Sequence, residues 1–284
     1  MTAASAPASS ANVGPGYDVV ALALAVRCRV EVEPSDRWEV VSGASGGEAL
    51  IRAAAAAVGP HLGPYRVVVS GDVPVGRGLG SSAALIVATM AAVVTSAGSE
   101  VDRDLLTARA SAVEGHGDNV AAAVHGGLVA VGPTGRVQQL EIHGSLRVLV
   151  AVPDATLPTV AARRATAGPV ATGVASRTAA RLAFLVEGLR RGDARLLAEA
   201  AGDELHEARR AALSPITVSL IEAARHAGAL HASWSGAGPS ALALVPDHPT
   251  AGAVRRAWQD VLAPGGGAVL EPGIDRDGVV VEQG

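Results

Sequence analysis

The hydrophobic positions change period along the chain, and this change predicts alternating strands and helices. Residues 19–32 are mostly apolar, and apolar and polar residues alternate over 26–32, which favours a half-exposed strand. Residues 38–41 are expected to pair with this strand. Alanine-rich or helically spaced apolar segments favour helices elsewhere. Further strands are predicted at 65–69, 128–131, 146–152 and near 279, and helices at 48–58, 103–114, 120–124, 172–191, 193–212, 218–227 and 250–262.

The pattern changes character after Pro158, from mixed strands and helices to long helical pairs. We therefore expect two domains, residues 1–152 and 153–284. The apolar segment 83–94 is shorter than the roughly 20 residues that a membrane span requires, so it predicts a buried helix. The first residues do not form a signal peptide, and a cytoplasmic location is expected.

Composition narrows the class of partner. The 284 residues are 49% hydrophobic and carry a net charge of -4, which suits a large core and argues against nucleic acid as the main partner. A small-molecule substrate, with no nucleic acid and no membrane, is the expected partner. Cys28 is the single cysteine and is expected to be a buried thiol, so no intrachain disulfide is available.

The chain contains no lysine, and all 23 of its basic residues other than histidine are arginine. This excludes the lysine-containing phosphate loop, the strand lysine of protein kinases and enzymes that form a Schiff base. At any phosphate site, backbone amides and a divalent cation must therefore do most of the charge neutralisation.

A glycine-rich segment between a predicted strand and a predicted helix is the strongest candidate for such a site. Gly76, Gly78 and Gly80 allow the backbone to approach a ligand closely, and Ser81 and Ser82 follow where the helix begins. Free N–H groups at a helix start bind phosphate. The alternative is a glycine turn in which serine caps the helix without any ligand.

Four segments resemble motifs of one family. PVGRGLGSSAA at 74–84 matches the second motif of the GHMP kinases, PxxxGLGSSAA, at every specified position. SGAGPS at 235–240 resembles the third motif of that family. PASSANVGPGYD at 7–18 resembles PATSANLGPGFD, and EGHGDN at 114–119 resembles EGHPDN, both from the homoserine kinase branch. The segments occur in family order and extend over nearly the full chain.

The resemblance implies a fold and an activity. It implies an α+β, two-domain GHMP kinase fold, with an N-terminal domain like ribosomal S5 domain 2 and a ferredoxin-like C-terminal domain. It implies ATP-dependent phosphorylation of L-homoserine to O-phospho-L-homoserine, a step of threonine biosynthesis, by a homodimer. The alternatives are a GHMP kinase for another small hydroxy acid or amino acid in a specialised pathway, and a catalytically silent relative that binds a nucleotide or metabolite.

The resemblance also implies where ATP and Mg²⁺ bind. Ser82 and Glu114 are the implied Mg²⁺ ligands, and with Asn119 they form the implied catalytic set. Taken alone, Glu114 could be a solvated carboxylate at a helix end. The implied ATP-binding residues are Pro74, Val75, Gly76, Arg77, Gly78, Leu79, Gly80, Ser81, Ser82, Ala83, Ala84, Gly236 and Gly238.

The resemblance to the homoserine kinase branch also places four polar residues around an amino-acid substrate: Asn12, Asp18, His116 and Asn119. Asn119 is the candidate for orienting the hydroxyl, and no general base is assigned. TVAAR at 159–163 and DELHEARR at 203–210 resemble segments that nominate Arg163 and Arg210 for the substrate carboxylate. Arg164 and Arg209 are adjacent rivals, and each pair could equally be helix surface. Ala49, Gly117 and RATAGPV at 164–170 depart from the family pattern, which leaves the choice of alcohol open.

Overall fold

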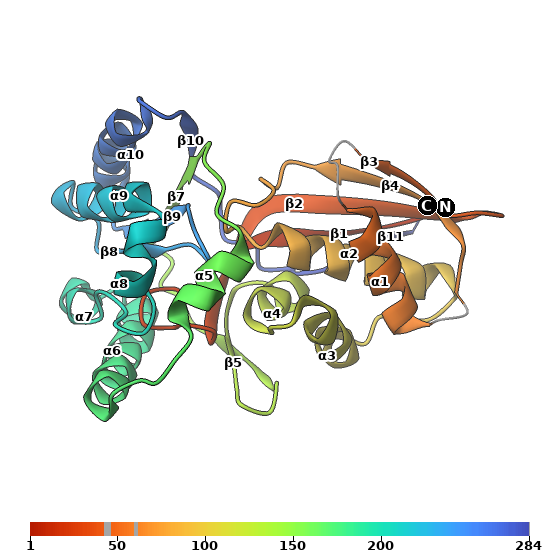
Figure 1. The fold of residues 1–284 in the computed structure, drawn as a ribbon, viewed down its shortest axis with the longest axis horizontal. Coiled ribbons are helices and arrows are strands. Elements are labelled where there is room, and N and C mark those ends of the chain that lie inside the picture. Colours follow the sequence, from red (N-terminus) through yellow and green to blue (C-terminus); the bar gives the residue numbers. More distant parts are fainter. Residues whose placement is uncertain (43–46, 60–61, 284) are drawn as a thin grey trace.

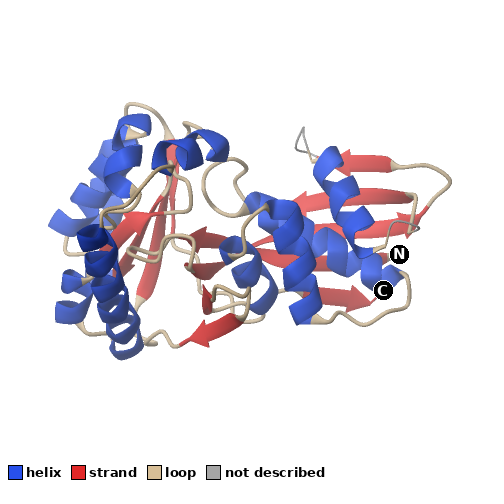
Figure 2. Cartoon of the chain, turned by 60° about the horizontal axis from the view of Figure 1, so that its bottom comes forward, coloured by secondary structure: helices blue, strands red, loops and turns tan. Residues whose placement is uncertain are grey.

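The computed structural model describes residues 1–42, 47–59 and 62–283, and these residues form two β-sheets side by side (Figures 1 and 2). The first sheet has the order β11-β1-β2-β4-β3, and β5 extends it by pairing with both β2 and β6. Its strands are β1 (Thr2–Ala11), β2 (Val20–Pro34), β3 (Glu39–Ser42), β4 (Tyr65–Gly71), β5 (Leu128–Val131), β6 (Val137–Leu140) and β11 (Val280–Gln283).

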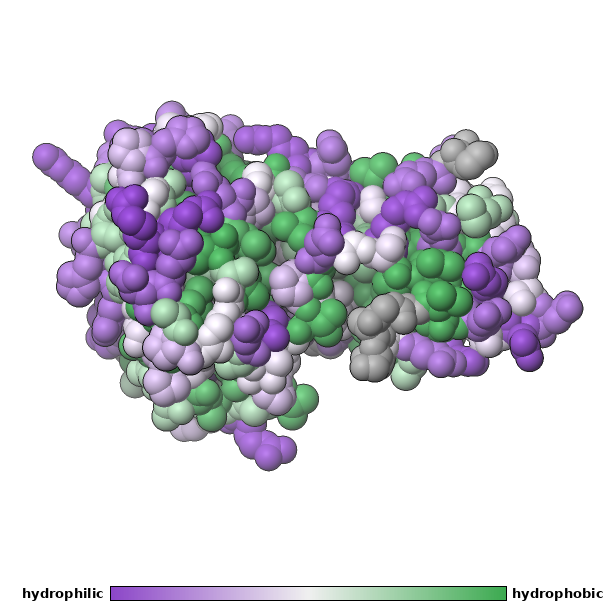
Figure 3. Space-filling model, turned by 90° about the horizontal axis from the view of Figure 1, so that it is seen from above, coloured by the Kyte–Doolittle hydropathy of each residue, from purple (hydrophilic) through white to green (hydrophobic). Residues whose placement is uncertain are grey.

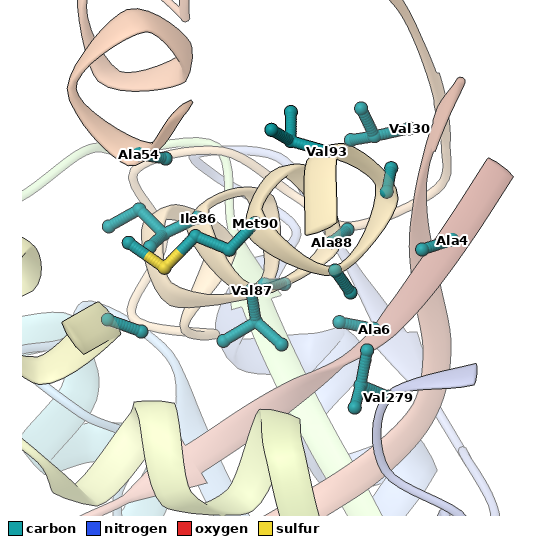
Figure 4. Packing of buried hydrophobic residues seen from close by; sticks show 14 of the residues in the cluster. Ala4, Ala6, Val30, Ala54, Ile86, Val87, Ala88, Met90, Val93 and Val279 are labelled. Atoms are coloured by element: carbon teal, nitrogen blue, oxygen red, sulfur yellow. The ribbon is translucent and has the colours of Figure 1, made fainter. Parts of the chain in front are cut away.

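Helices α1 (Glu48–Val58), α2 (Ser81–Ser96), α3 (Arg103–Glu114) and α4 (Asp118–His125) lie against the first sheet (Figure 1). Helix α2 is apolar on nearly every side and is buried along most of its length. Figure 4 shows Val87 and Ala88 of α2 close to Ala4 and Ala6 of β1. The small alanine side chains let the helix approach the strand closely.

The second sheet is antiparallel and has the order β10-β7-β9-β8. Its strands β7 (Arg147–Pro153), β8 (His231–Trp234), β9 (Ala241–Val245) and β10 (Gly267–Leu270) follow a β-α-β-β-α-β pattern in the chain, as in ferredoxin-like folds. Helices α9 (Pro215–His226) and α10 (His248–Leu262) cover one face, where Trp234 and Trp258 are fully buried.

The other face of the second sheet packs against α6 (Thr172–Arg191) and α7 (Ala194–Glu199). Leu22 and Leu24 of β2 belong to the same apolar cluster, so this core joins the two sheets. Two short helices, α5 (Thr159–Thr166) and α8 (Glu207–Arg210), complete this half, and a 3₁₀ turn at Ala211–Leu213 follows α8. Helix α5 lies between the two halves (Figure 1).

Two expectations about the elements are wrong, and one strand was missed. Strand β3 pairs in parallel with β4 instead of with β2. The helix expected over 193–212 is broken, because Gly202 has a φ of 81° and the Asp203 carboxylate accepts from the N–H of Leu205, which starts a new turn. Strand β1 was not anticipated, since its alanines and serines lack an alternating apolar pattern.

The strands also divide differently from the expected domains. Strand β7, expected in the N-terminal domain, pairs in the second sheet, and β11, expected in the C-terminal domain, pairs with β1. The chain therefore changes sheet between β6 and β7 and returns at its last strand. The limits 1–152 and 153–284 of the domains themselves stay a prediction.

The surface carries polar and apolar residues side by side. In Figure 3 hydrophilic residues make up most of the outline at both ends, and hydrophobic residues show on the face between them. Among the described residues, every helix is too short or too polar to cross a bilayer.

Candidate active site

One pocket brings the four motif segments together. Each of its walls comes from a different element: the turn after β1, the glycine loop before α2, the turn between α3 and α4, α5, α8, and the turn between β8 and β9. Its lining residues are Asn12, Asp18, Gly76, Gly78, Leu79, Gly80, Ser81, Ser82, Glu114, His116, Asp118, Asn119, Thr159, Arg163, Arg210, Gly236 and Ala237.

The glycine loop forms the start of α2 without a side-chain cap. Gly80 is the N-cap residue, with a φ of 63°, and no side chain accepts a hydrogen bond from the first turn. The alternative in which a serine caps this helix is therefore wrong. A Cβ atom on Gly80 would lie 2.2 Å from Ser9 Oγ, and one on Gly78 would lie 2.3 Å from the carbonyl oxygen of Ser235. Uncapped N–H groups at this helix end are suited to an anion.

The other residues of the expected ATP-binding set lie elsewhere. Arg77 donates to the carbonyl oxygen of Pro153, and Val75 is exposed. Ala83 and Ala84 are fully buried in the core beneath the loop. Gly238 packs against the Trp234 ring and Pro74 is half-buried, and neither lines the pocket. Within 74–84, the segments that line the pocket are Gly76 and 78–82.

Acidic and hydroxyl oxygens converge at the end of α3. Ser82 Oγ donates to Glu114 Oε2 at 2.5 Å, and His116 Nε2 lies 3.6 Å from Glu114 Oε1. Burial raises the pKa of Glu114. Burial also disfavours charge on His116, but its hydrogen bond to Asp118 and the charges of Asp118 and Glu114 outweigh this and raise its pKa.

Asn119, the second residue of α4, has its side-chain oxygen close to the glycine loop. Its Oδ1 accepts from Ser9 Oγ at 2.8 Å, and its backbone N–H donates to Asp118 Oδ1 at 2.8 Å. Ser9 and Asn119 are both buried. Ser9 was absent from the expected site, although it lies in the motif at 7–18.

The turn after β1 holds Asp18 at the mouth of the pocket. Asn12 and Asp18 both have positive φ values, 58° and 55°. The Asn12 side chain donates to the carbonyl oxygen of Gly236 and accepts from the N–H of Asp18, each at 2.8 Å. Both ends of its amide are thus engaged within the protein. The Asp18 carboxylate pairs with Arg163 at 3.0 Å.

The structure separates the members of each arginine pair. Arg210 is buried, lines the pocket and donates to the carbonyl oxygen of Gly236, whereas Arg209 is exposed and donates to carbonyl oxygens of 166 and 169. Arg163 lines the pocket and Arg164 does not. Burial lowers the pKa of Arg210.

Two aromatic rings support Arg210 and were not anticipated from the sequence. The Arg210 guanidinium lies over the Tyr17 ring at 5.2 Å, and Tyr17 stacks on His206 at 5.1 Å. Burial and the charge of Arg210 lower the pKa of His206 to about 3, so this ring is neutral. Tyr17 precedes Asp18 and His206 lies near Arg210 in the sequence, and this proximity could have indicated that both rings belong to the site.

The residues present fit a divalent cation that takes some of its ligands from the protein and the others from a nucleotide. In the part of the chain that the structure describes, no group of three or more His, Cys, Asp or Glu side chains could hold a metal alone. Ser82 and Glu114 nevertheless place two oxygens 2.5 Å apart beside the uncapped helix end. Mg²⁺ commonly takes one or two protein oxygens and completes its shell with phosphates and water.

Two packed sheets that share a pocket, with a glycine loop at an uncapped helix start, are the arrangement of a two-domain kinase. A family model described as GHMP kinases N terminal domain matches residues 48–127, and one described as GHMP kinases C terminal matches residues 185–263. The chain belongs to the GHMP kinases, a family of ATP-dependent phosphotransferases. The family and fold expected from the motifs are confirmed.

Individual relatives cover almost the whole chain. The homoserine kinase of Gloeobacter violaceus is 38% identical and covers 97% of both chains. That of Deinococcus radiodurans is 35% identical, over 98% of this chain and 95% of the relative. The crystal structure of homoserine kinase from Cytophaga hutchinsonii superposes with a TM-score of 0.88 at 26% identity, covering 99% of this chain and 97% of that one.

Proposed function

We propose that this enzyme transfers the γ-phosphoryl group of ATP to the side-chain hydroxyl of L-homoserine. The observation that carries the proposal is the charge pattern of the pocket. The Asp18 carboxylate suits an ammonium group, and the guanidinium groups of Arg163 and Arg210 suit a carboxylate. These lie in one pocket with the glycine loop, so an amino acid held by both ends can present its hydroxyl to a phosphate. The names of the relatives support this substrate.

The Asp18–Arg163 pair is half-exposed, with 38% of each side chain accessible. A surface pair of this kind contributes only about 0–1 kcal/mol, so a zwitterionic ligand can separate it at small cost. The substrate ammonium would then replace Arg163 beside Asp18, and the substrate carboxylate would replace Asp18 beside Arg163. Asn12 would act indirectly, since its amide holds the N–H of Asp18 and the carbonyl oxygen of Gly236.

The phosphates of ATP would lie on the N–H groups at the start of α2, and Ser82 and Glu114 would hold Mg²⁺. When bound, Mg²⁺ supplies positive charge that neutralises the phosphate oxygens during transfer. The substrate oxygen would attack the γ-phosphorus in line as the bond to the β-phosphate oxygen breaks and ADP leaves, and the hydroxyl proton would pass to the transferred phosphoryl group or to water. Most of the acceleration would come from positioning and electrostatics.

An ADP-release assay with Mg-ATP tests the substrate directly. L-Homoserine, L-threonine, L-serine, mevalonate and shikimate are compared at equal concentrations, and kcat/KM is expected to be highest for L-homoserine. A higher kcat/KM for another alcohol would identify that alcohol, and not L-homoserine, as the substrate. ATP binding without turnover of any alcohol would indicate a silent relative.

A further inference from the structure

Ser9 lies where three parts of the active site meet. Its backbone N–H donates to the carbonyl oxygen of Leu79 in the glycine loop at 3.0 Å. Its hydroxyl donates to Oδ1 of Asn119, the second residue of α4, at 2.8 Å. Ser9 is 0% exposed, and the Cβ position of Gly80 is 2.2 Å from its hydroxyl oxygen. One side chain on β1 therefore touches both the loop and α4.

The hydrogen bond from Ser9 decides which end of the Asn119 amide faces the pocket. An asparagine amide has one accepting oxygen and one donating NH₂ group, and the two are nearly equal in size. Since Oδ1 accepts from the Ser9 hydroxyl, Nδ2 is directed away from Ser9. In a reversed amide Nδ2 would donate to Ser9 Oγ, and the Ser9 hydroxyl proton would lose Oδ1, its acceptor among the described residues. A buried donor left without an acceptor costs about 1–3 kcal/mol.

We infer that Ser9 is a positioning residue that fixes the Asn119 amide with its NH₂ group toward the substrate. The inference rests on the proposed function, because it takes Asn119 to contact the reacting hydroxyl. An amide held in this way donates to a lone pair of the hydroxyl oxygen and cannot accept the hydroxyl proton. Asn119 then orients the attacking oxygen and is not a general base.

The neighbouring residue provides a matched control. Ser10 is also a fully buried serine of β1, and its hydroxyl makes no hydrogen bond to any residue that the structure describes. Ser9→Ala and Ser10→Ala therefore remove the same atom one residue apart, and only the first releases Asn119. Ser9→Thr keeps the hydroxyl and matches the threonine of the motif PATSANLGPGFD.

A double-mutant cycle with Asn119→Ala tests the inference. Ser9→Ala is expected to lower kcat about tenfold and to leave KM for ATP within about twofold, because a misdirected group affects the reacting geometry more than binding. In the Asn119→Ala background, Ser9→Ala should cause no further loss, since residues acting through one interaction are not additive. Ser10→Ala and Ser9→Thr should retain kcat.

An equal loss of kcat in both backgrounds would overturn the inference, and so would unchanged kcat in Ser9→Ala. If Ser9→Ala does not fold, as judged from its melting temperature, Ser9→Cys enters the same cycle with a weaker donor of similar size. The cycle is run with whichever alcohol the wild-type enzyme phosphorylates. Failure of L-homoserine as substrate is thus seen in the wild type, separately from failure of the Ser9 coupling.

Discussion

Individual residues divide into those that face the pocket and those that hold them there. Asn12, Ser82, Glu114 and Asn119 line the pocket. Ser9 does not line it and donates to Asn119, and Asn12 also accepts from the N–H of Asp18. The motifs identified the residues that line the pocket. They could not reveal the partners of these side chains, because a hydrogen bond between residues 9 and 119 depends on the tertiary fold.

Glu114→Gln should abolish most activity and leave the fold intact. Replacing the carboxylate removes the negative ligand that would balance Mg²⁺, so kcat should fall at least about 100-fold, a typical loss for an electrostatic group at the reaction centre. Relief of a buried charge should keep the melting temperature at or above that of the wild type. Steady-state kinetics and thermal unfolding measure both, with exposed Glu100→Gln as the control. Near-normal turnover would place the metal elsewhere.

Arg210 and its neighbour Arg209 form a natural pair of test and control. Arg210→Lys keeps the charge but loses the planar fork, so KM for the amino acid should rise roughly tenfold while KM for ATP changes little. Arg209→Lys should leave both values unchanged, because Arg209 faces carbonyl oxygens on the surface. If Arg210→Lys instead raised only KM for ATP, the carboxylate assignment would be wrong.

At the scale of elements, the sequence predicted the helices and strands whose hydrophobic residues recur with the period of their buried face. Helices α1, α3 and α6 begin and end where the apolar spacing and glycine signals indicate. Strand β1 escaped detection because it is buried on nearly every residue and so shows no alternation. The break at Gly202 was also missed, since helix propensity on both sides of it is high and tertiary packing decides the outcome.

The glycine loop provides a comparison of two substitutions in one element. Gly76 and Gly80 both have positive φ, 70° and 63°, but a Cβ at Gly76 would meet nothing within 4 Å. Gly76→Ala should cost about 1 kcal/mol from backbone strain alone. Gly80→Ala adds the clash with Ser9 Oγ and should cost a further 1–3 kcal/mol, roughly the price of overpacking.

Denaturant unfolding of both variants measures this difference, and kcat should fall much further for Gly80→Ala. Equal free energies of unfolding would show that the neighbours of Gly80 move aside without cost. Gly98→Ala, at another positive φ with open space around it, is the control for strain away from the pocket.

At the scale of the molecule, the pocket exists only when both sheets are assembled. Asn12 joins the turn after β1 to Gly236 of the second sheet, and Ser235 donates to the carbonyl oxygen of Gly78 in the glycine loop. The order of the motifs indicated the two-domain fold. Sequence order alone could not indicate that β7 and β11 cross the expected domain limit, because strand partners are set by the whole topology.

Acid should destabilise the folded molecule through His231. This ring is fully buried, and burial lowers its pKa to about 4, below the ordinary value of about 6.5. Between these two pKa values the unfolded chain binds a proton that the native state does not. The contribution of His231 to the free energy of unfolding is therefore present above about pH 6.5 and is lost as the pH falls toward 4. The loss for this group should be roughly 2 kcal/mol between pH 7 and pH 5.

Melting temperatures from pH 7 to pH 5 check this effect. The decline should be shallower for His231→Gln than for the wild type, whatever the absolute stability of the variant. His248→Gln, at an exposed histidine, should keep the wild-type slope. Identical slopes in all three proteins would contradict a neutral, buried His231.

The pairing of β11 with β1 has a consequence for biosynthesis. Strand β1 carries Ser9 and leads into the turn that holds Asn12, yet its outer neighbour β11 follows every other strand of both sheets in the chain. Until β11 docks, the nascent chain presents the edge of β1 as an open template for other extended segments. Protection of this edge by a chaperone during translation is therefore expected to raise the yield of active enzyme.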